Sequence, residues 1–308
     1  MKKTLALALA GGLGLTLLAS APALAQAKAK PGAKAAPAPA RLDLNQPDDA
    51  LKAFRKLQAS LVDGKPVVFW FQGSVYSRVA GEPDKHLFSY QAFNIRAGHT
   101  APDIGRGYGF RLVSKELVLY MDPVTHEVLK TWKNPWTGKE VDVIHIANDP
   151  VNQRPMYAQS DRGPYKFTGT VKQGTVMQSA EVPLFYTNPL GGDYQNYVGG
   201  TYHAIELFNF FASEDELLGP GDGADNASVS WARVSQWLPW MEMGGRAGWL
   251  IFNGSGRRVS GFDALPDVVK REVEANYPEY KTPPPADDAR PNETSWTYFK
   301  KKLDAKKK

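Results

Sequence analysis

The spacing of hydrophobic residues changes near Val67, and the two spacings predict two kinds of local structure. Before Val67, Leu51, Phe54 and Leu57 recur at helical intervals in the segment NQPDDALKAFRKLQASL. Pro47 and two acidic residues fall in the first turn of this segment, as is usual at the start of a helix. We therefore expect a helix here, ending before the Gly-Lys-Pro sequence that follows.

After Val67 hydrophobic and polar residues alternate, which is the pattern of a half-buried strand. The segments VVFWFQGSVYSRV, HLFSYQAFNIRAG, YGFRLVSKELVLYM, EVLKTW and EVDVIHIA are rich in β-branched and aromatic residues. The same pattern predicts further strands at 166–173, 175–182, 201–211, 229–234 and 247–252. A last helix is expected at about 265–277, with Pro266 in its first turn.

Short turn motifs separate these strands. DPVTH (122–126) resembles NPWTG (134–138), and in both the proline presets φ while Asp122 or Asn134 can hydrogen-bond the backbone ahead of it. Their spacing predicts two consecutive hairpins. GSG (254–256) is also expected to form a hairpin turn, because it lacks the G-x-S-x-G pattern of a catalytic serine.

The predicted fold is mainly β. Roughly ten strands joined as an antiparallel meander, with short terminal helices only, indicate a lipocalin-like (calycin-like) barrel or a strongly curved sheet. A flat sheet of that many strands would have to curl or split. A closed barrel of this size would enclose a cavity as well as a core.

The first residues have the composition of a Sec-type secretory signal peptide. Lys2 and Lys3 precede an apolar run, and Ala23-Leu24-Ala25 is typical of a cleavage site after Ala25. We therefore expect a periplasmic or secreted protein. The predicted boundaries are 1–25 for the signal peptide, 26–44 for an Ala/Pro/Lys linker, 45–282 for a single β-barrel-like domain and 283–308 for a polar, Lys-rich C-terminal tail.

The net charge of +5 comes from the two ends of the chain, which are rich in lysine, whereas the body between them is acidic. A nucleic-acid-binding protein would carry its basic residues as a patch on the folded body, so no nucleic acid is expected as a partner. Weak electrostatic contact of the lysine-rich ends with an anionic envelope surface is expected instead. The absence of cysteine excludes disulfides, thiol nucleophiles and thiolate metal sites.

Two histidines are candidate catalytic residues. His145 lies in a strand-like segment, either packed with one satisfied nitrogen or facing the interior as a proton-transfer group. His203 and Glu206 have a spacing that suits a metal on a helix, but TYHAIELFNFF favours a strand, which would place the two side chains on opposite faces. We therefore predict His145, His203 and Glu206 as candidate acid–base residues, with no metal and no cofactor.

Aromatic residues are concentrated in SWARVSQWLPWMEMGGRAGWLIF, and most of them should fill the core. The remainder, with a few polar groups, would line an apolar small-molecule pocket. Arginines within strands more often face solvent, but an inward one would suit a carboxylate or phenolate ligand. The candidate ligand-binding residues are Trp70, Gln72, Arg78, Asn94, Arg96, Asn148, Trp231, Trp237 and Trp240.

Several of these segments together resemble a known family. HLFSYQAFNIRAG, NPWTGKEVDVIHIANDPVN, YTNPL, SWARVSQWLPWMEMG and ALPDVV are similar to the family of domain of unknown function 1838, from about Leu51 to Tyr280. The resemblance implies no reaction, cofactor or catalytic residue. It does imply that the NPWTG and NDPVN segments are hallmarks of the fold.

Three functions are compatible with this sequence. The leading hypothesis is a secreted β-barrel protein that binds a small hydrophobic or aromatic molecule. The alternative is a cofactor-independent lyase, isomerase or hydratase, in which His145 or His203 is the general acid–base and Arg78 or Arg96 stabilises an oxyanion. The third is a structural envelope protein anchored by its lysine-rich ends.

Overall fold

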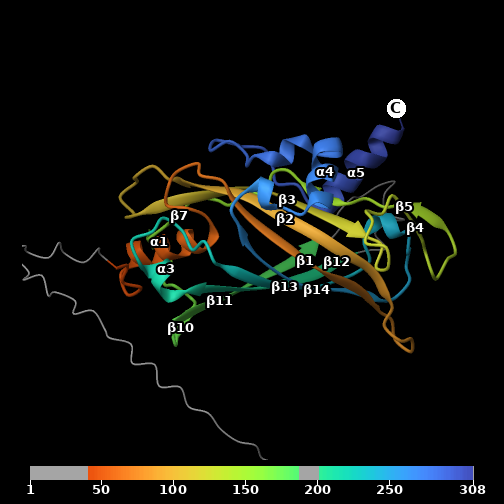
Figure 1. Cartoon of the computed structure of the whole chain (residues 1–308), viewed down its shortest axis with the longest axis horizontal. Coiled ribbons are helices and arrows are strands. Elements are labelled where there is room, and N and C mark those ends of the chain that lie inside the picture. Colours follow the sequence, from red (N-terminus) through yellow and green to blue (C-terminus); the bar gives the residue numbers. More distant parts are fainter. Residues whose placement is uncertain (1–40, 187–200, 308) are drawn as a thin grey trace, which may run out of the picture. The chain divides into compact units, whose positions relative to one another are not determined.

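The computed structural model describes residues 41–186 and 201–307 of the chain. Its central feature is one 10-stranded sheet in the order β10-β11-β12-β13-β14-β1-β2-β3-β6, with β7 also paired to β3 (Figure 1). The strands are β1 (Val67–Arg78), β2 (His86–Thr100), β3 (Gly109–Met121), β6 (Ile146–Asn148), β7 (Met156–Tyr157), β10 (Thr170–Lys172), β11 (Thr175–Tyr186), β12 (Tyr202–Ser213), β13 (Ser228–Ser235) and β14 (Trp249–Val259).

Smaller elements complete the described structure. Two separate hairpins pair β4 (Thr131–Lys133) with β5 (Glu140–Asp142) and β8 (Gln159–Ser160) with β9 (Gly163–Pro164). The α-helices are α1 (Pro47–Gln58), α3 (Glu214–Leu218), α4 (Asp267–Asn276) and α5 (Ser295–Lys306), and the 3-10 helices are η2 (Pro239–Met241), η3 (Phe262–Ala264) and η4 (Pro278–Lys281). No helix in the described ranges has both the length and the apolar composition needed to cross a membrane.

The predicted mainly β fold is confirmed, and every strand pair in the sheet is antiparallel. Most neighbours in the sheet are also neighbours in sequence, as a meander requires. The sheet is not a closed barrel, since its strand order runs from β10 to β6 without a pairing that joins these two ends in the described residues.

The sheet nevertheless curls strongly toward one face. Glu116 on β3 and Glu206 on β12 lie five strand positions apart on the same face. In a flat sheet that separation is about 24 Å, at about 4.8 Å a strand. On this same face the ring centroids of Tyr120 (β3) and Phe252 (β14), three strand positions apart, are only 6.4 Å from each other, so the sheet bends toward the face of the two glutamates. We call the face that holds them the concave face.

Helices and aromatic residues fill and cover this sheet. At one end of the concave face, α1 and α3 pack Leu57 and Leu217 against Phe69 and Phe210 (Figure 1). At the other end the segment around η2 contributes Trp240 and its neighbours to a large aromatic core. The opposite, convex face is covered over β1 to β3 by α4, through residues that include Val269 and Val273.

The two turn motifs form as predicted, and their first side chains cap the turns. Asp122 Oδ1 accepts hydrogen bonds from the backbone N–H groups of Val124 and Thr125, both at 2.8 Å. Asn134 Oδ1 accepts in the same way from Trp136 N–H at 2.9 Å. The second motif joins β4 to β5.

The expectation that GSG (254–256) forms a hairpin turn is wrong, because these residues lie inside β14. Gly254 is opposite Gly73 on β1, and the side chain of Tyr90 lies across this pair. A Cβ atom built at Gly254 would be 1.9 Å from the Tyr90 hydroxyl. Glycine is therefore required here by close packing within a strand rather than by a turn.

The C-terminal segment also differs from the expected polar tail, because it ends in helix α5. Thr294 begins the helix with a capping box, and Trp296 and Phe299 are buried, each only 2% exposed. Trp296 packs on Tyr202 of β12, with ring centroids 4.8 Å apart. The i, i+3 spacing of the two aromatic residues gives this lysine-rich helix one apolar face. The predicted signal peptide (1–25) lies outside the described residues, as does the linker up to residue 40.

Candidate functional site

Charged and amide side chains gather in the middle of the concave face, between the two aromatic ends. Strand pairing places Asn94 of β2 opposite Glu116 of β3, and Glu116 opposite Asn148 of β6. On the other side of the curl, Glu206 of β12 is opposite Arg233 of β13. We call the following residues the concave cluster: Asn94, Arg96, Glu116, Asn148, Glu206 and Arg233.

Arg233 is the centre of one half of this cluster. Its Nη1 donates to Glu206 Oε1 at 2.9 Å, and its Nη2 donates to the Tyr202 hydroxyl at 2.9 Å. The guanidinium carbon lies 5.8 Å from the ring centroid of Phe252. Its Nε is buried and has no hydrogen-bond partner in the described part of the chain. The nearby Tyr120 hydroxyl, on a residue with no exposed surface, likewise has none.

Arg96 is the centre of the other half. Its Nη1 donates to Gln58 Oε1 of α1 at 2.7 Å, and its Nη2 donates to Asn94 Oδ1 at 2.9 Å. The guanidinium lies 5.0 Å from the ring centroid of Phe69. Burial lowers the pKa of Arg96 to about 10, although Glu116 opposes that shift. Arg96 therefore remains charged at neutral pH, with amide oxygens as its hydrogen-bond acceptors.

The two carboxylates are more accessible than the arginine of the first half. The Glu206 side chain is 18% exposed while that of its partner Arg233 is 7% exposed. Glu116 is partly exposed and accepts a hydrogen bond from Asn148 Nδ2. Asn148 is 5% exposed, and its Oδ1 has no partner among the described residues.

Aromatic side chains form a narrow slot beside Arg96 and Asn94. The slot has a volume of about 10 Å³, which is room for one water molecule. Trp231 is 5% exposed, and its Nε1–H has no acceptor in the described ranges. The aromatic residues that line the slot are Phe69, Phe71, Phe208, Phe210 and Trp231.

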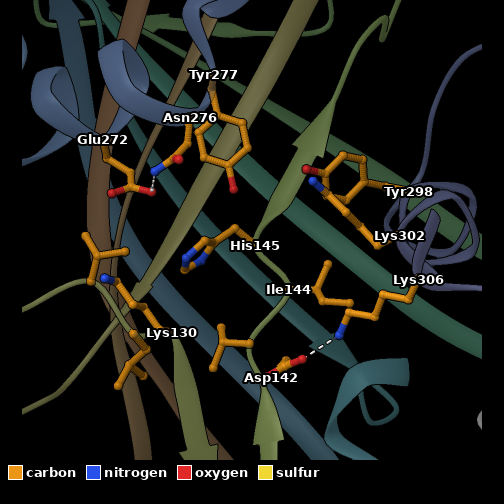
Figure 2. A pocket seen from close by; sticks show the side chains of 13 residues that line it. Lys130, Asp142, Ile144, His145, Glu272, Asn276, Tyr277, Tyr298, Lys302 and Lys306 are labelled. Carbon is orange, nitrogen blue, oxygen red and sulfur yellow. Dashed lines mark hydrogen bonds and ion pairs between the residues drawn. The ribbon is translucent and has the colours of Figure 1, made fainter. Parts of the chain in front are cut away.

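His145 lies outside the concave cluster, at the side of a groove of about 450 Å³ between the β4–β5 region, α4 and α5 (Figure 2). Tyr277, Tyr298 and Lys302 contribute to the same groove. In Figure 2 the Tyr277 hydroxyl is directed toward His145, and an ion pair joins Lys306 to Asp142.

Both nitrogens of His145 are engaged with the backbone. Nδ1 accepts from the Tyr120 N–H at 3.1 Å, and the other nitrogen hydrogen-bonds the backbone of Leu129. Burial lowers the pKa of His145 to about 4, so the imidazole is neutral near pH 7. A neutral histidine with both nitrogens occupied holds two segments of backbone together.

The structure brings only part of the predicted ligand set together. Asn94, Arg96, Asn148, Trp231 and the predicted acid–base residue Glu206 meet on the concave face. Because β12 is a strand, His203 points to the other face, where it is exposed and packs on Phe185.

The remaining candidates lie elsewhere. Trp70 and Gln72 project from the convex face, where Trp70 Nε1 donates to Gln91 at 3.3 Å. Arg78 is exposed and pairs with Asp84 at 2.7 Å. Trp237 and Trp240 belong to the aromatic core at the η2 end. The described residues contain no group of three or more histidines, aspartates and glutamates that could hold a metal ion.

Sequence reasoning missed Glu116, Tyr202 and Arg233. Arg233 had the same signal that drew attention to Arg78 and Arg96, a cation inside an alternating apolar strand. Glu116 is an acid in such a strand, within VSKELVLY. Which of these residues faces inward depends on the strand register and the curl of the sheet.

Comparison with known proteins identifies the family of this chain. The profile of the family described as protein of unknown function (DUF1838) matches residues 64–303, which include the large sheet and most of α5. A search among curated proteins found no match. Since the matched region covers most of the chain, this protein belongs to the DUF1838 family.

Proposed function

We propose that this protein binds a small molecule with an aromatic or apolar body on the concave face of its sheet, at the concave cluster. The observation that carries the proposal is the set of buried polar atoms left without partners there. They are Arg96 Nε, Tyr120 OH, Asn148 Oδ1, Trp231 Nε1 and Arg233 Nε. The open, curled sheet would take the role that a closed barrel has in lipocalin-like proteins.

An unpaired buried donor or acceptor costs about 1–3 kcal/mol, so native proteins keep few of them. Several on one face, in strands that are otherwise regularly paired, are expensive for folding alone. A ligand or ordered water that satisfies them would recover that free energy. The aromatic side chains around Trp231 would supply the apolar contact that fixes the body of the ligand.

A second function, acid–base catalysis at the same place, is favoured by Glu206. Burial raises its pKa, Arg233 opposes that shift and Glu116 adds to it, so Glu206 keeps a proton to higher pH than an ordinary glutamate. Glu206 would donate a proton to the bound molecule, Glu116 would accept one, and Arg233 would stabilise an oxyanion. The reaction would be that of a lyase, isomerase or hydratase without a cofactor.

The location of the protein also remains a proposal. From the apolar run and the Ala-Leu-Ala sequence near its start, we propose a mature protein that begins at Gln26 and acts in the periplasm or outside the cell. Lysines on α5 would give it weak contact with an anionic envelope surface.

Native mass spectrometry of the protein purified from its own compartment tests the binding function. We expect a co-purified small molecule on wild-type protein and on Gln72→Ala, a convex-face control. Asn148→Ala and Trp231→Phe should lose it while their melting temperatures show a folded protein. A ligand retained equally by all four proteins would contradict a site on the concave face. Glu206→Gln separates the two functions, since it should preserve binding and abolish turnover only if the protein is an enzyme.

A further inference from the structure

We infer that the ligand of the concave cluster is an anion, an aromatic carboxylate whose carboxylate pairs with Arg96. This inference rests on the proposed function and specifies its ligand. It comes from a difference between Arg96 and the other interior arginines, together with the aromatic slot beside it.

Each buried arginine in the described part of the chain, with at most 7% of its surface exposed, reaches a carboxylate. These ion pairs are Arg55 with Asp63 at 2.6 Å, Arg233 with Glu206 at 2.9 Å and Arg258 with Asp225 at 3.1 Å. Arg96 has no carboxylate within ion-pair distance among the described residues; its two hydrogen bonds go to the amides of Gln58 and Asn94. Arg96 is partly buried, and a guanidinium whose protein partners are only amides would gain from an anionic partner.

Charges of both signs lie near Arg96. Arg258 is near enough to disfavour the charge on Arg96, and the carboxylate that favours it, Glu116, is already hydrogen-bonded by Asn148. The two amide partners leave the guanidinium with further N–H donors, including Nε, in the planar geometry that a carboxylate matches. An anion that binds at the cluster would therefore meet an arginine that no protein carboxylate contacts directly.

The aromatic slot indicates what is attached to the anion. Phe69 lies under the guanidinium, and Phe71, Phe208 and Trp231 continue the slot away from it. Aromatic side chains around a flat space favour a flat, conjugated body through stacked or edge-on contacts. The slot holds one water as it stands, so a ring would enter as Phe208, which is partly exposed, moves outward.

Matched pairs of compounds test this inference on the wild-type protein. Benzoate, phenylacetate and cinnamate would be titrated by calorimetry against benzamide, phenylacetamide and cinnamamide. We expect at least one acid to bind about tenfold or more tightly than its amide, because only the acid neutralises Arg96. Binding of acids and amides with equal affinity would overturn the anion inference and leave the proposed function in place. Binding of none of the six at millimolar concentration would also overturn the anion inference, whereas the proposed function is decided by the co-purified ligand in native mass spectrometry.

Two variants test whether Arg96 causes the preference for the acid over its amide. Arg96→Gln should abolish the preference for the acid over its amide, whereas the exposed control Arg78→Gln should keep the wild-type preference. Asn94→Asp tests the same point without removing the arginine, since it puts a carboxylate where Asn94 Oδ1 now accepts from Nη2. We expect it to weaken binding of the acid tenfold or more without lowering the melting temperature. Acid binding that is unchanged in a folded Asn94→Asp or Arg96→Gln protein would contradict a role for Arg96.

Discussion

Tyr120 and His145 are joined by a hydrogen bond from the Tyr120 N–H to His145 Nδ1, at 3.1 Å, and by stacked rings whose centroids are 6.0 Å apart. The Leu129 N–H donates to the Tyr120 carbonyl at 3.0 Å, and the other imidazole nitrogen hydrogen-bonds the backbone of Leu129. The imidazole therefore completes the backbone hydrogen bonding between β3 and the segment before β4. His145 stabilises the edge of the sheet next to the groove in Figure 2.

Replacing His145 with alanine should destabilise the fold. The substitution leaves a buried N–H of Tyr120 and a backbone group of Leu129 without partners, each costing about 1–3 kcal/mol. We expect the free energy of unfolding, measured with urea, to fall by about 3 kcal/mol. His203→Ala is the matched control and should change it by less than about 0.5 kcal/mol, because His203 is exposed. Equal effects of the two substitutions would show that the hydrogen bonds of His145 contribute nothing to stability.

The same histidine predicts a pH dependence of stability. Its pKa is about 4 in the folded protein, below the value near 6.5 of an unfolded chain. A depressed pKa gives stability that is complete above about pH 6.5 and is lost as pH falls toward 4, up to about 3 kcal/mol. Lys302, which faces the ring across the groove, acts in the same direction. Urea unfolding between pH 7.5 and 5 should show a shallower loss for His145→Gln than for wild type. Parallel curves would contradict a neutral, buried His145.

Helix α5 should be needed for stability in spite of its lysines. Trp296 is 2% exposed and packs on Tyr202. Trp296→Ala should lower the free energy of unfolding by about 3–5 kcal/mol, the usual cost of removing a buried aromatic side chain. Lys300→Ala, which breaks an exposed i, i+4 pair with Asp304, should cost about 0.5 kcal/mol or less. If thermal melts of both variants matched wild type, α5 would not be docked on the sheet.

Gly254 should not tolerate a side chain. A Cβ there would lie 1.9 Å from the Tyr90 hydroxyl and 2.5 Å from the Gln72 carbonyl oxygen. Gly254→Ala should therefore lower the melting temperature sharply, and adding Tyr90→Phe should restore part of it, because the backbone clash remains. Gly245→Ala, where a Cβ meets nothing within 4 Å, is the control and should be neutral. A neutral Gly254→Ala would contradict the packing of Tyr90 across the glycine pair.

Local chemistry explains which parts of the fold were predictable. The turns at Asp122 and Asn134 depend on side chains that bond their own backbone, and such turns can be predicted from a few residues. The turn predicted at Gly254 was wrong because glycine is required there by the packing of Tyr90, a residue far away in sequence. Helix α5 was missed because Trp296 and Phe299 are isolated aromatic residues in a charged segment.

The candidate site was predictable only in part, for a related reason. Alternation in a strand separates its two faces, but it does not say which face a curled sheet encloses. His203 and Glu206 were expected on opposite faces and are, yet only the structure shows that Glu206 is the inner one. Arg78 and Arg96 could not be distinguished as ligand-binding residues from the sequence, because both lie in strand-like segments. The first lies at a strand end beside Asp84 and the second lies under α1.

The indole N–H resonances of the eight tryptophans test the central claim most directly, because Trp231 Nε1–H has no acceptor among the described residues. In proton–nitrogen correlation spectra, the Trp231 signal should shift as benzoate, or the co-purified ligand, saturates the protein. Trp70 Nε1–H, bonded to Gln91 on the convex face, and Trp237 Nε1–H, bonded to the Arg246 carbonyl, should move little. A ligand that binds while the Trp231 signal stays fixed and the Trp70 signal moves would contradict a site on the concave face.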